Sequence, residues 1–286
     1  MGTIDGPIAG VSIDPIPYLP FMDGPAPAGP DAFRWRLGVR PLDLDDWVEL
    51  GADADAAIAA KPRLMAEHPD TVFAVLDDRV ADEGGEVADV LVEHLRRRWP
   101  ERYGDAIVDP ALHPLDAAAR LVPEDLVLLV ERDGRLVFGG GSVCFPNRWD
   151  LRSKLGLTMA GVHAPVDRLN EQLEAPIDGV LERLTPERSF WRLGWGVLDT
   201  ADGSPPVDGP AAPRPRRPAL GEYVLRVERE TLRRFPETGC VLFTIRTYVT
   251  ALVTAAASPD VAARLSAALS SLPGDVRDYK DLATVA

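Results

Sequence analysis

The sequence predicts an α+β fold, in which a helical N-terminal layer precedes a mostly antiparallel sheet that carries helical inserts. Three observations predict it. Helical apolar spacing prevails up to residue 121, strand-like apolar runs prevail after it, and an Asp-Gly turn joins two of those runs into a hairpin. The chain has 286 residues, 46% of them hydrophobic, which is enough apolar material for a sizeable core.

Composition limits the possible partners and the compartment. A net charge of −14 makes the surface acidic, so we expect no nucleic acid and no membrane as partner. The two cysteines, Cys144 and Cys240, cannot form a disulfide framework or a thiolate metal site by themselves. No basic region followed by an apolar run opens the sequence, and no apolar run reaches about 18 residues, so we expect a cytoplasmic protein.

The N-terminal part predicts an extended segment followed by helices. Residues 1–32 are rich in Gly, Pro and Asp and read as extended, whereas 33–286 read as one domain. Asp43 is placed as the N-cap of a short helix. Helical spacing predicts helices at 53–67, 85–98 and 113–121, and residues 71–76 read as either a strand or a helix end.

The remaining sequence predicts the sheet and its inserts. Residues 126–138 form the expected hairpin, and the three glycines that follow it, 139–141, suggest a close backbone approach or a bulge. An apolar stripe after His163 predicts a helix that Pro176 kinks. The other expected elements are strands at 190–198, 223–227 and 240–249, a short helix at 228–235, helices between 251 and 272, and a mobile loop at 200–220.

Residues 142–163 hold the densest group of candidate functional side chains. Trp149, Arg148, Lys154 and His163 all lie in this one connection, just before a helix start. A capping or buried structural role competes with a ligand role for His163. Of the other histidines, His68 and His113 precede prolines, which favours loop or capping roles, and His94 is expected to be solvated.

Arg246 is the second candidate, because a cation inside an apolar strand requires a partner. Strand alternation puts Arg246 and Tyr248 on one face, together with Leu242 and Thr244. That face either lines a site or is a solvent-facing edge, and Glu228 and Arg192 are the candidate partners of Arg246.

The sequence lacks the motifs of several other kinds of active site. The sequence contains no HExxH, no closely spaced histidine pair, no Gly-x-Ser-x-Gly elbow and no Walker loop. Gly139–Gly141 lack dinucleotide-binding spacing, and Cys144 reads as a small core residue. A haem protein needs a single axial histidine, and without Cys-x-x-Cys-His no covalent attachment is expected.

Six groups of residues, in the same order along the chain, carry a resemblance to a known family. They are Trp35–Gly38 with Pro41–Asp43 and Asp46-Trp47; Arg120–Leu126; Ser142–Pro146 with Trp149 and Lys154–Gly156; Val162–Val166; Arg226–Arg229 with Thr231–Arg234; and Thr238-Gly239 with Phe243–Tyr248. From about Phe33 to about Tyr279 the chain resembles the bacterial family typified by the haem-dependent oxidative N-demethylase of dimethylamine.

The resemblance implies a haem b bound in a PAS-like antiparallel fold. It implies His163 as the axial iron ligand, with Arg148, Lys154 and Trp149 as further cofactor contacts. It also implies oxidative N-demethylation of a small secondary or tertiary amine by dioxygen, with electrons from a flavin and iron–sulfur reductase and release of formaldehyde. Arg246, Tyr248 and Glu228 are then the catalytic candidates. A non-catalytic haem-binding PAS-like sensor or carrier, or a haem-free structural protein, are the alternatives.

Overall fold

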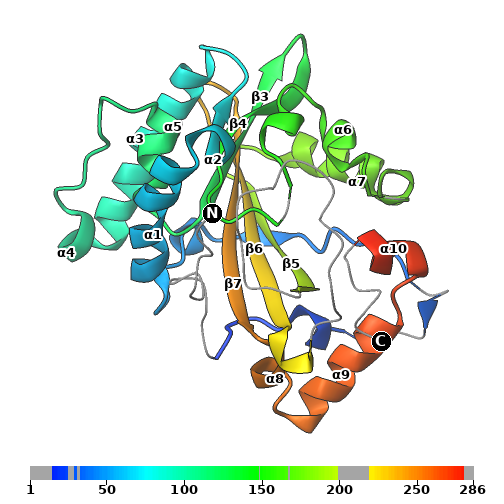
Figure 1. Cartoon of the computed structure of the whole chain (residues 1–286). Helices are drawn as coiled ribbons and strands as arrows, with labels where there is room; N and C mark the ends of the chain where they lie inside the picture. Colours follow the sequence, from blue (N-terminus) through cyan, green and yellow to red (C-terminus); the bar gives the residue numbers. More distant parts are fainter. Residues whose placement is uncertain are drawn as a thin grey trace.

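The computed structural model describes residues 15–24, 29–30, 33–147, 149–166, 168–198 and 219–279. Its centre is an antiparallel sheet with helices on both sides (Figure 1). Residues 200–218 of the predicted loop 200–220, most of the predicted extended segment 1–32 and the candidate Arg148 lie outside these residues.

Seven strands of the described residues form one sheet, in the order β1-β5-β6-β7-β3-β4-β2. They are β1 (Arg40–Leu42), β2 (Phe73–Val75), β3 (Asp125–Arg132), β4 (Arg135–Ser142), β5 (Ser189–Leu198), β6 (Val224–Arg234) and β7 (Val241–Ala251). The predicted hairpin is β3-β4, and its turn residues Asp133 and Gly134 have φ of 52° and 74°, the left-handed geometry that Asp-Gly favours. The order places β7 between β6 and β3, so the last long strand is central.

One face of the sheet, here called the α3 face, is covered by the predicted helical N-terminal layer (Figure 1). That layer consists of α1 (Ala54–Glu67), α2 (Pro69–Val72), α3 (Val80–Arg98), α4 (Pro100–Tyr103) and α5 (Pro114–Ala119). Leu91 and Leu95 of α3 share one apolar cluster with Leu126, Leu128 and Leu242 of the sheet. The α+β class with a helical N-terminal layer is thereby confirmed.

The opposite face, here called the α7 face, is covered by the segment between β4 and β5. This segment contains η4 (Arg152–Lys154), α6 (Met159–His163) and α7 (Leu169–Arg183). Leu181 of α7 packs with Val127, Leu129 and Val241 of the sheet. The helical stripe predicted after His163 therefore has its apolar side buried.

The far end of the sheet is closed by short helices. They are η1 (Pro20–Met22), η5 (Leu220–Glu222), α8 (Leu252–Ala255), α9 (Pro259–Ser270) and α10 (Gly274–Tyr279). Phe21, Leu225, Tyr248, Leu265 and Val276 meet there in a further apolar cluster. The short helix η3 (Leu44–Asp46) lies instead beside the end of α3, where Arg98 Nε donates a hydrogen bond to the Asp45 carbonyl at 3.2 Å. Asp43 caps η3 as predicted, and its Oδ1 accepts a hydrogen bond from the Asp45 amide at 3.0 Å.

Two predictions about local structure are wrong. Residues 228–235 are not a helix, because β6 runs unbroken to Arg234 and pairs with both β5 and β7. Cross-strand pairing outweighs the helix preference of the glutamates and arginines in this run. His94 is not solvated: it is 2% exposed and packs between the rings of Trp47 and Trp99.

Candidate functional site

His163 is the last residue of α6, on the α7 side of the sheet (Figure 1). Thr158 caps this short helix, since its side-chain oxygen accepts a hydrogen bond from the Gly161 amide at 3.4 Å. The His163 ring is half-buried, and its Nδ1 has no hydrogen-bond partner among the described residues. The predicted ligand thus has a buried nitrogen that its described neighbours do not use.

The surroundings keep the His163 ring neutral. Burial lowers its pKa most, and the nearby cations Arg192 and Lys154 lower it further, while the Met159 carbonyl partly opposes this. A neutral imidazole keeps a nitrogen lone pair, which is the form that binds metals. The electrostatics therefore suit a ligand role better than a general-acid role.

Two other predicted contacts lie close to this histidine. Lys154 donates a hydrogen bond from Nζ to the Val162 carbonyl at 3.1 Å, and burial lowers the pKa of its ammonium group. Trp149 packs edge-on against Phe138, with ring centroids 6.2 Å apart. Trp149 packs against the apolar cluster on the α7 face, as do Leu155 and Val162, the sequence neighbours of Lys154 and His163.

Strands β5 and β6 carry a row of charged side chains on the α7 face, of which Arg192 is close enough to His163 to lower its pKa. Arg192 Nε lies 3.2 Å from Glu230 Oε2, and Arg226 Nη2 lies 2.8 Å from Glu228 Oε1. Pairing between β5 and β6 sets Arg192 opposite Glu230, so the side chains of the two residues share the α7 face. The predicted catalytic residue Glu228 therefore lies on the same face as His163.

Gly194 lies directly below these carboxylates. A Cβ at Gly194 would meet Glu230 Oε1 at 2.9 Å and Glu228 Oε2 at 3.4 Å, so both carboxylates converge above this glycine. Each of these acids is already paired with an arginine, Glu230 with Arg192 and Glu228 with Arg226, so they form a compact cluster of charges on the α7 face.

Arg246 and Tyr248 lie on the other side of the sheet. Their positions in β7 put them on the α3 face, as strand alternation predicts, whereas Glu228 pairs with Thr247 on the α7 face. The structure therefore does not bring Arg246 and Tyr248 together with Glu228 and His163.

Arg246 has a structural partner of its own. It is 1% exposed, and its Nη2 lies 2.5 Å from Asp53 Oδ1 in a buried ion pair. It is thus not a solvent-facing edge residue, and its partner is neither Glu228 nor Arg192. Glu228 pairs with Arg226, and Arg192 pairs with Glu230.

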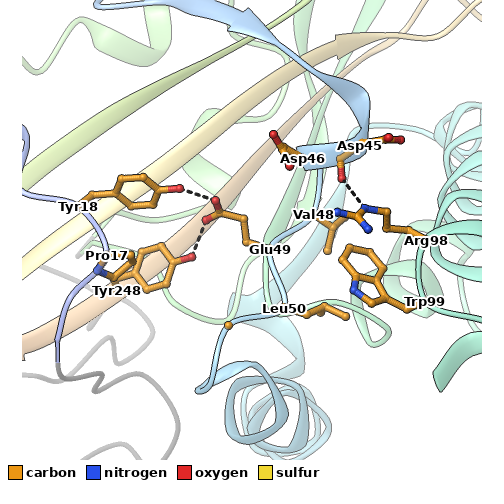
Figure 2. A pocket seen from close by; sticks show the side chains of 11 residues that line it. Pro17, Tyr18, Asp45, Asp46, Val48, Glu49, Leu50, Arg98, Trp99 and Tyr248 are labelled. Carbon is orange, nitrogen blue, oxygen red and sulfur yellow. Dashed lines mark hydrogen bonds between the residues drawn. The ribbon is translucent and has the colours of Figure 1, made fainter. Parts of the chain in front are cut away.

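Tyr248 lines a separate pocket of about 340 Å³ on the α3 face (Figure 2). Its hydroxyl donates a hydrogen bond to Glu49 Oε2 at 2.5 Å, and Tyr18 donates to Oε1 of the same carboxylate. Arg229 Nε is 3.1 Å from Glu49 Oε1. Figure 2 shows both phenol rings directed toward Glu49, which fixes Tyr248 in place.

Sequence reasoning missed Glu230 as a member of the candidate site. The signal was the alternation along 224–234, where Arg226, Glu228 and Glu230 fall on one face of a continuous strand. Assigning a helix to 228–235 hid that alternation. In the described part of the chain, no group of three or more His, Cys, Asp or Glu side chains is placed to hold a metal ion. None of the helices in that part is long and apolar enough to cross a membrane.

Comparison with known proteins assigns most of the chain to one family. Residues 38–286 match the family model described as "Haem-dependent oxidative N-demethylase, alpha subunit-like". The match covers the whole sheet and every side chain that surrounds His163.

Proposed function

Because the chain belongs to the haem-dependent oxidative N-demethylase alpha subunit-like family, we propose that it is a haem-dependent oxidoreductase that demethylates a small secondary or tertiary amine. The amine loses its N-methyl group as formaldehyde, dioxygen accepts electrons, and a separate reductase supplies them. The observation that carries the proposal is the half-buried His163 ring, whose Nδ1 has no hydrogen-bond partner among the described residues and whose pKa is lowered by burial and by the nearby cations Arg192 and Lys154.

The side chains around His163 fit a haem. The lowered pKa of the ring favours the neutral form, which would bind the haem iron, and the apolar cluster that includes Trp149 also contains Met159 and Val162 from the same helix as His163. Lys154 and Arg192 provide positive charge close to His163, which suits the two carboxylates of a haem. Arg148 remains a candidate for the same role. A haem b, bound without covalent attachment, is part of the proposal.

Each candidate residue would then have its own role in the reaction. His163 binds the cofactor, and Lys154 with Arg192 orients it through its carboxylates. Glu228 and Glu230 hold the substrate ammonium group above Gly194, where their oxygens converge. Bound haem would supply the activation of dioxygen. The apolar wall formed by Trp149 and Phe243 limits the access of water to this chemistry.

The overall reaction balances with an external source of electrons. One N-methyl amine, one dioxygen, two electrons and two protons give the demethylated amine, formaldehyde and water. None of the described side chains supplies these electrons by itself. We therefore propose that a reductase with a flavin and an iron–sulfur cluster donates them. The family description names an alpha subunit, which supports an assembly with other subunits. The strand order, with β7 between β6 and β3, supports a PAS-like sheet.

An absorption spectrum tests the cofactor assignment. Purified protein reconstituted with haem is expected to show a Soret band that shifts on reduction and on addition of carbon monoxide. His163→Ala should lose or alter this spectrum, whereas His68→Ala should keep it, because His68 caps α1 on the other side of the sheet. A native spectrum in His163→Ala would refute the ligand assignment, and no Soret band in the wild type would refute the haem.

A turnover assay separates the enzyme from a sensor or carrier. With haem, dimethylamine, dioxygen and a chemical reductant or the reductase, the enzyme releases formaldehyde in proportion to the oxygen consumed. A haem spectrum without formaldehyde would contradict the enzymatic part and favour the non-catalytic haem-binding protein.

A further inference from the structure

Two buried polar atoms of α6 and α7 have no hydrogen-bond partner among the described residues. They are Nδ1 of His163 and Oδ1 of Asn170, the second residue of α7. A neutral imidazole that binds iron through Nε2 carries its proton on Nδ1, which is then a donor, whereas the oxygen of a side-chain amide is an acceptor. Leaving either atom buried without a bond costs about 1–3 kcal/mol, so the two atoms complement one another.

Asn170 is already attached to the helix that carries His163. Its Nδ2 donates a hydrogen bond to the Ala160 carbonyl at 2.8 Å. In an α-helix this carbonyl would accept from the backbone amide of Ala164, but that amide bonds to the Gly161 carbonyl instead. The Asn170 side chain therefore supplies the donor that the end of α6 leaves missing.

The His163 ring lies over the same turn of α6. Side chains of a helix point back toward its N-terminus, over the residues three and four positions earlier, which are Ala160 and Met159 for His163. The Met159 carbonyl is close enough to the imidazole to raise its pKa, against the other influences on the ring. The amide of Asn170, held at the next carbonyl along the chain, is thus placed beside the ring.

A second side chain holds the same end of α6. Lys154 Nζ donates a hydrogen bond to the carbonyl of Val162, the residue before His163, at 3.1 Å. Asn170 and Lys154 thus bind two carbonyls of this five-residue helix from outside it. The backbone that carries His163 is therefore fixed relative to the Asn170 amide.

We propose that Asn170 is a positioning residue for the axial histidine, and that in the haem-loaded protein its Oδ1 accepts a hydrogen bond from Nδ1–H of His163. This inference rests on the proposed haem ligation. A hydrogen bond from the second ring nitrogen fixes the tautomer and orientation of a ligating histidine and raises its basicity. A more basic imidazole stabilises ferric haem relative to ferrous haem, so Asn170 lowers the reduction potential.

Resonance Raman spectra and redox titrations of haem-loaded, full-length protein test the proposal. Asn170→Leu keeps the size of the side chain and removes both bonds, so the iron–histidine stretching band of ferrous protein should move to lower frequency. The affinity for ferric haem should fall about tenfold more than that for ferrous haem, which raises the reduction potential by about 59 mV for one electron. Asn170→Asp loses the donor to Ala160 but keeps a stronger acceptor, so the band should move to higher frequency and the potential should fall.

Gln172→Leu is the matched control. Gln172 is another amide side chain of α7, but its Oε1 accepts a hydrogen bond from the backbone amide of Trp35 at 3.0 Å, outside α6. This variant should keep the Raman band and the reduction potential of the wild type. Circular dichroism of the haem-free variants shows whether each one is folded.

The direction of the shifts separates a hydrogen bond to His163 from a purely structural role. If Asn170 only holds α6, Asn170→Leu and Asn170→Asp lose the same bond to Ala160, and they should shift the band alike or both lose haem. Either result refutes the proposal. An unshifted band in both variants also refutes it, and is expected if the Met159 carbonyl accepts the proton of His163 instead.

Failure of the proposed function gives a different result. If the wild type binds no haem, or if His163→Ala keeps the iron–histidine band of the wild type, the ligand assignment fails and the inference fails with it. If the wild type shows the band and His163→Ala loses it, the shifts in the two Asn170 variants decide the inference alone.

Discussion

The buried ion pair between Arg246 and Asp53 should dominate the response to mutation of Arg246. Both side chains are at most 4% exposed, with Arg246 Nη2 2.5 Å from Asp53 Oδ1. The other oxygen, Asp53 Oδ2, has no hydrogen-bond partner among the described residues, so no second donor compensates for the loss of Arg246. Arg246→Met therefore leaves an uncompensated buried carboxylate, which costs about 3–5 kcal/mol.

The loss of free energy corresponds to a fall in the melting temperature, and the size of that fall depends on the length of the chain. An unfolding entropy of about 2.1 cal/mol/K per residue, scaled to 286 residues, gives about 0.6 kcal/mol/K, so Tm should fall by about 5–8 °C. Differential scanning calorimetry of wild type and variant measures it. Adding Asp53→Asn to Arg246→Met should recover at least about 1 kcal/mol, because the unpaired charge is then gone.

A surface pair provides the matched control. Arg102 and Asp55 are 2.6 Å apart, but their side chains are 37% and 82% exposed, so Arg102→Met should cost no more than about 1 kcal/mol. The haem spectrum of folded Arg246→Met should equal that of the wild type, because Arg246 lies on the face away from His163. An unchanged Tm together with an altered haem spectrum would refute the structural role and restore Arg246 as a site residue.

Three further predictions concern buried groups. Burial lowers the pKa of His94 to about 4, so the unfolded state binds a proton that the folded state does not, and stability should fall from about pH 6.5 to pH 4. His94→Leu should flatten this part of a pH series of urea midpoints. Burial raises the pKa of the Cys144 and Cys240 thiols to about 12, so native protein at pH 8 should resist Ellman's reagent, and urea should expose both thiols. Gly140→Ala should lower stability by about 1–3 kcal/mol in calorimetry, because its Cβ would lie 2.8 Å from the Ala74 carbonyl.

Each of these has a result that would contradict it. Identical pH series for wild type and His94→Leu would mean that the imidazole is protonated in the folded state. Rapid thiol reaction in native protein would mean that β7 or the β4 end opens readily. A Tm of Gly140→Ala equal to that of Gly85→Ala, where the added methyl meets open space, would show that β2 and β4 can separate without cost.

Local patterns in the chain were enough to predict many of its elements. The Asp-Gly turn specifies the β3-β4 hairpin because its backbone needs two positive φ angles. Period-two alternation placed Arg246 and Tyr248 on a common face of β7, and they do share it. The predicted capping role of His113 also holds, since its Nδ1 accepts a hydrogen bond from the Leu115 amide. These features depend on residues within a few positions of one another.

Contacts between residues that are far apart in the sequence could not be predicted from such local patterns. Residues 228–235 look helical in isolation, and β6 exists because two neighbouring strands supply its hydrogen bonds. His94 lies on a charged helix, yet Trp47 and Trp99 bury it. In both cases the deciding partner lies in a segment whose position only the folded chain determines.

The sequence by itself determined the α+β class, the family, and His163, Lys154 and Trp149 as neighbours in one connection, because these rest on composition, motif order and local spacing. The tertiary structure alone decided that Glu228 and Glu230 lie on the α7 face of the sheet while Arg246 and Tyr248 lie on the α3 face. The physical reason is strand pairing: register between β5, β6 and β7 assigns each side chain to a face, and a shift by one residue would exchange them.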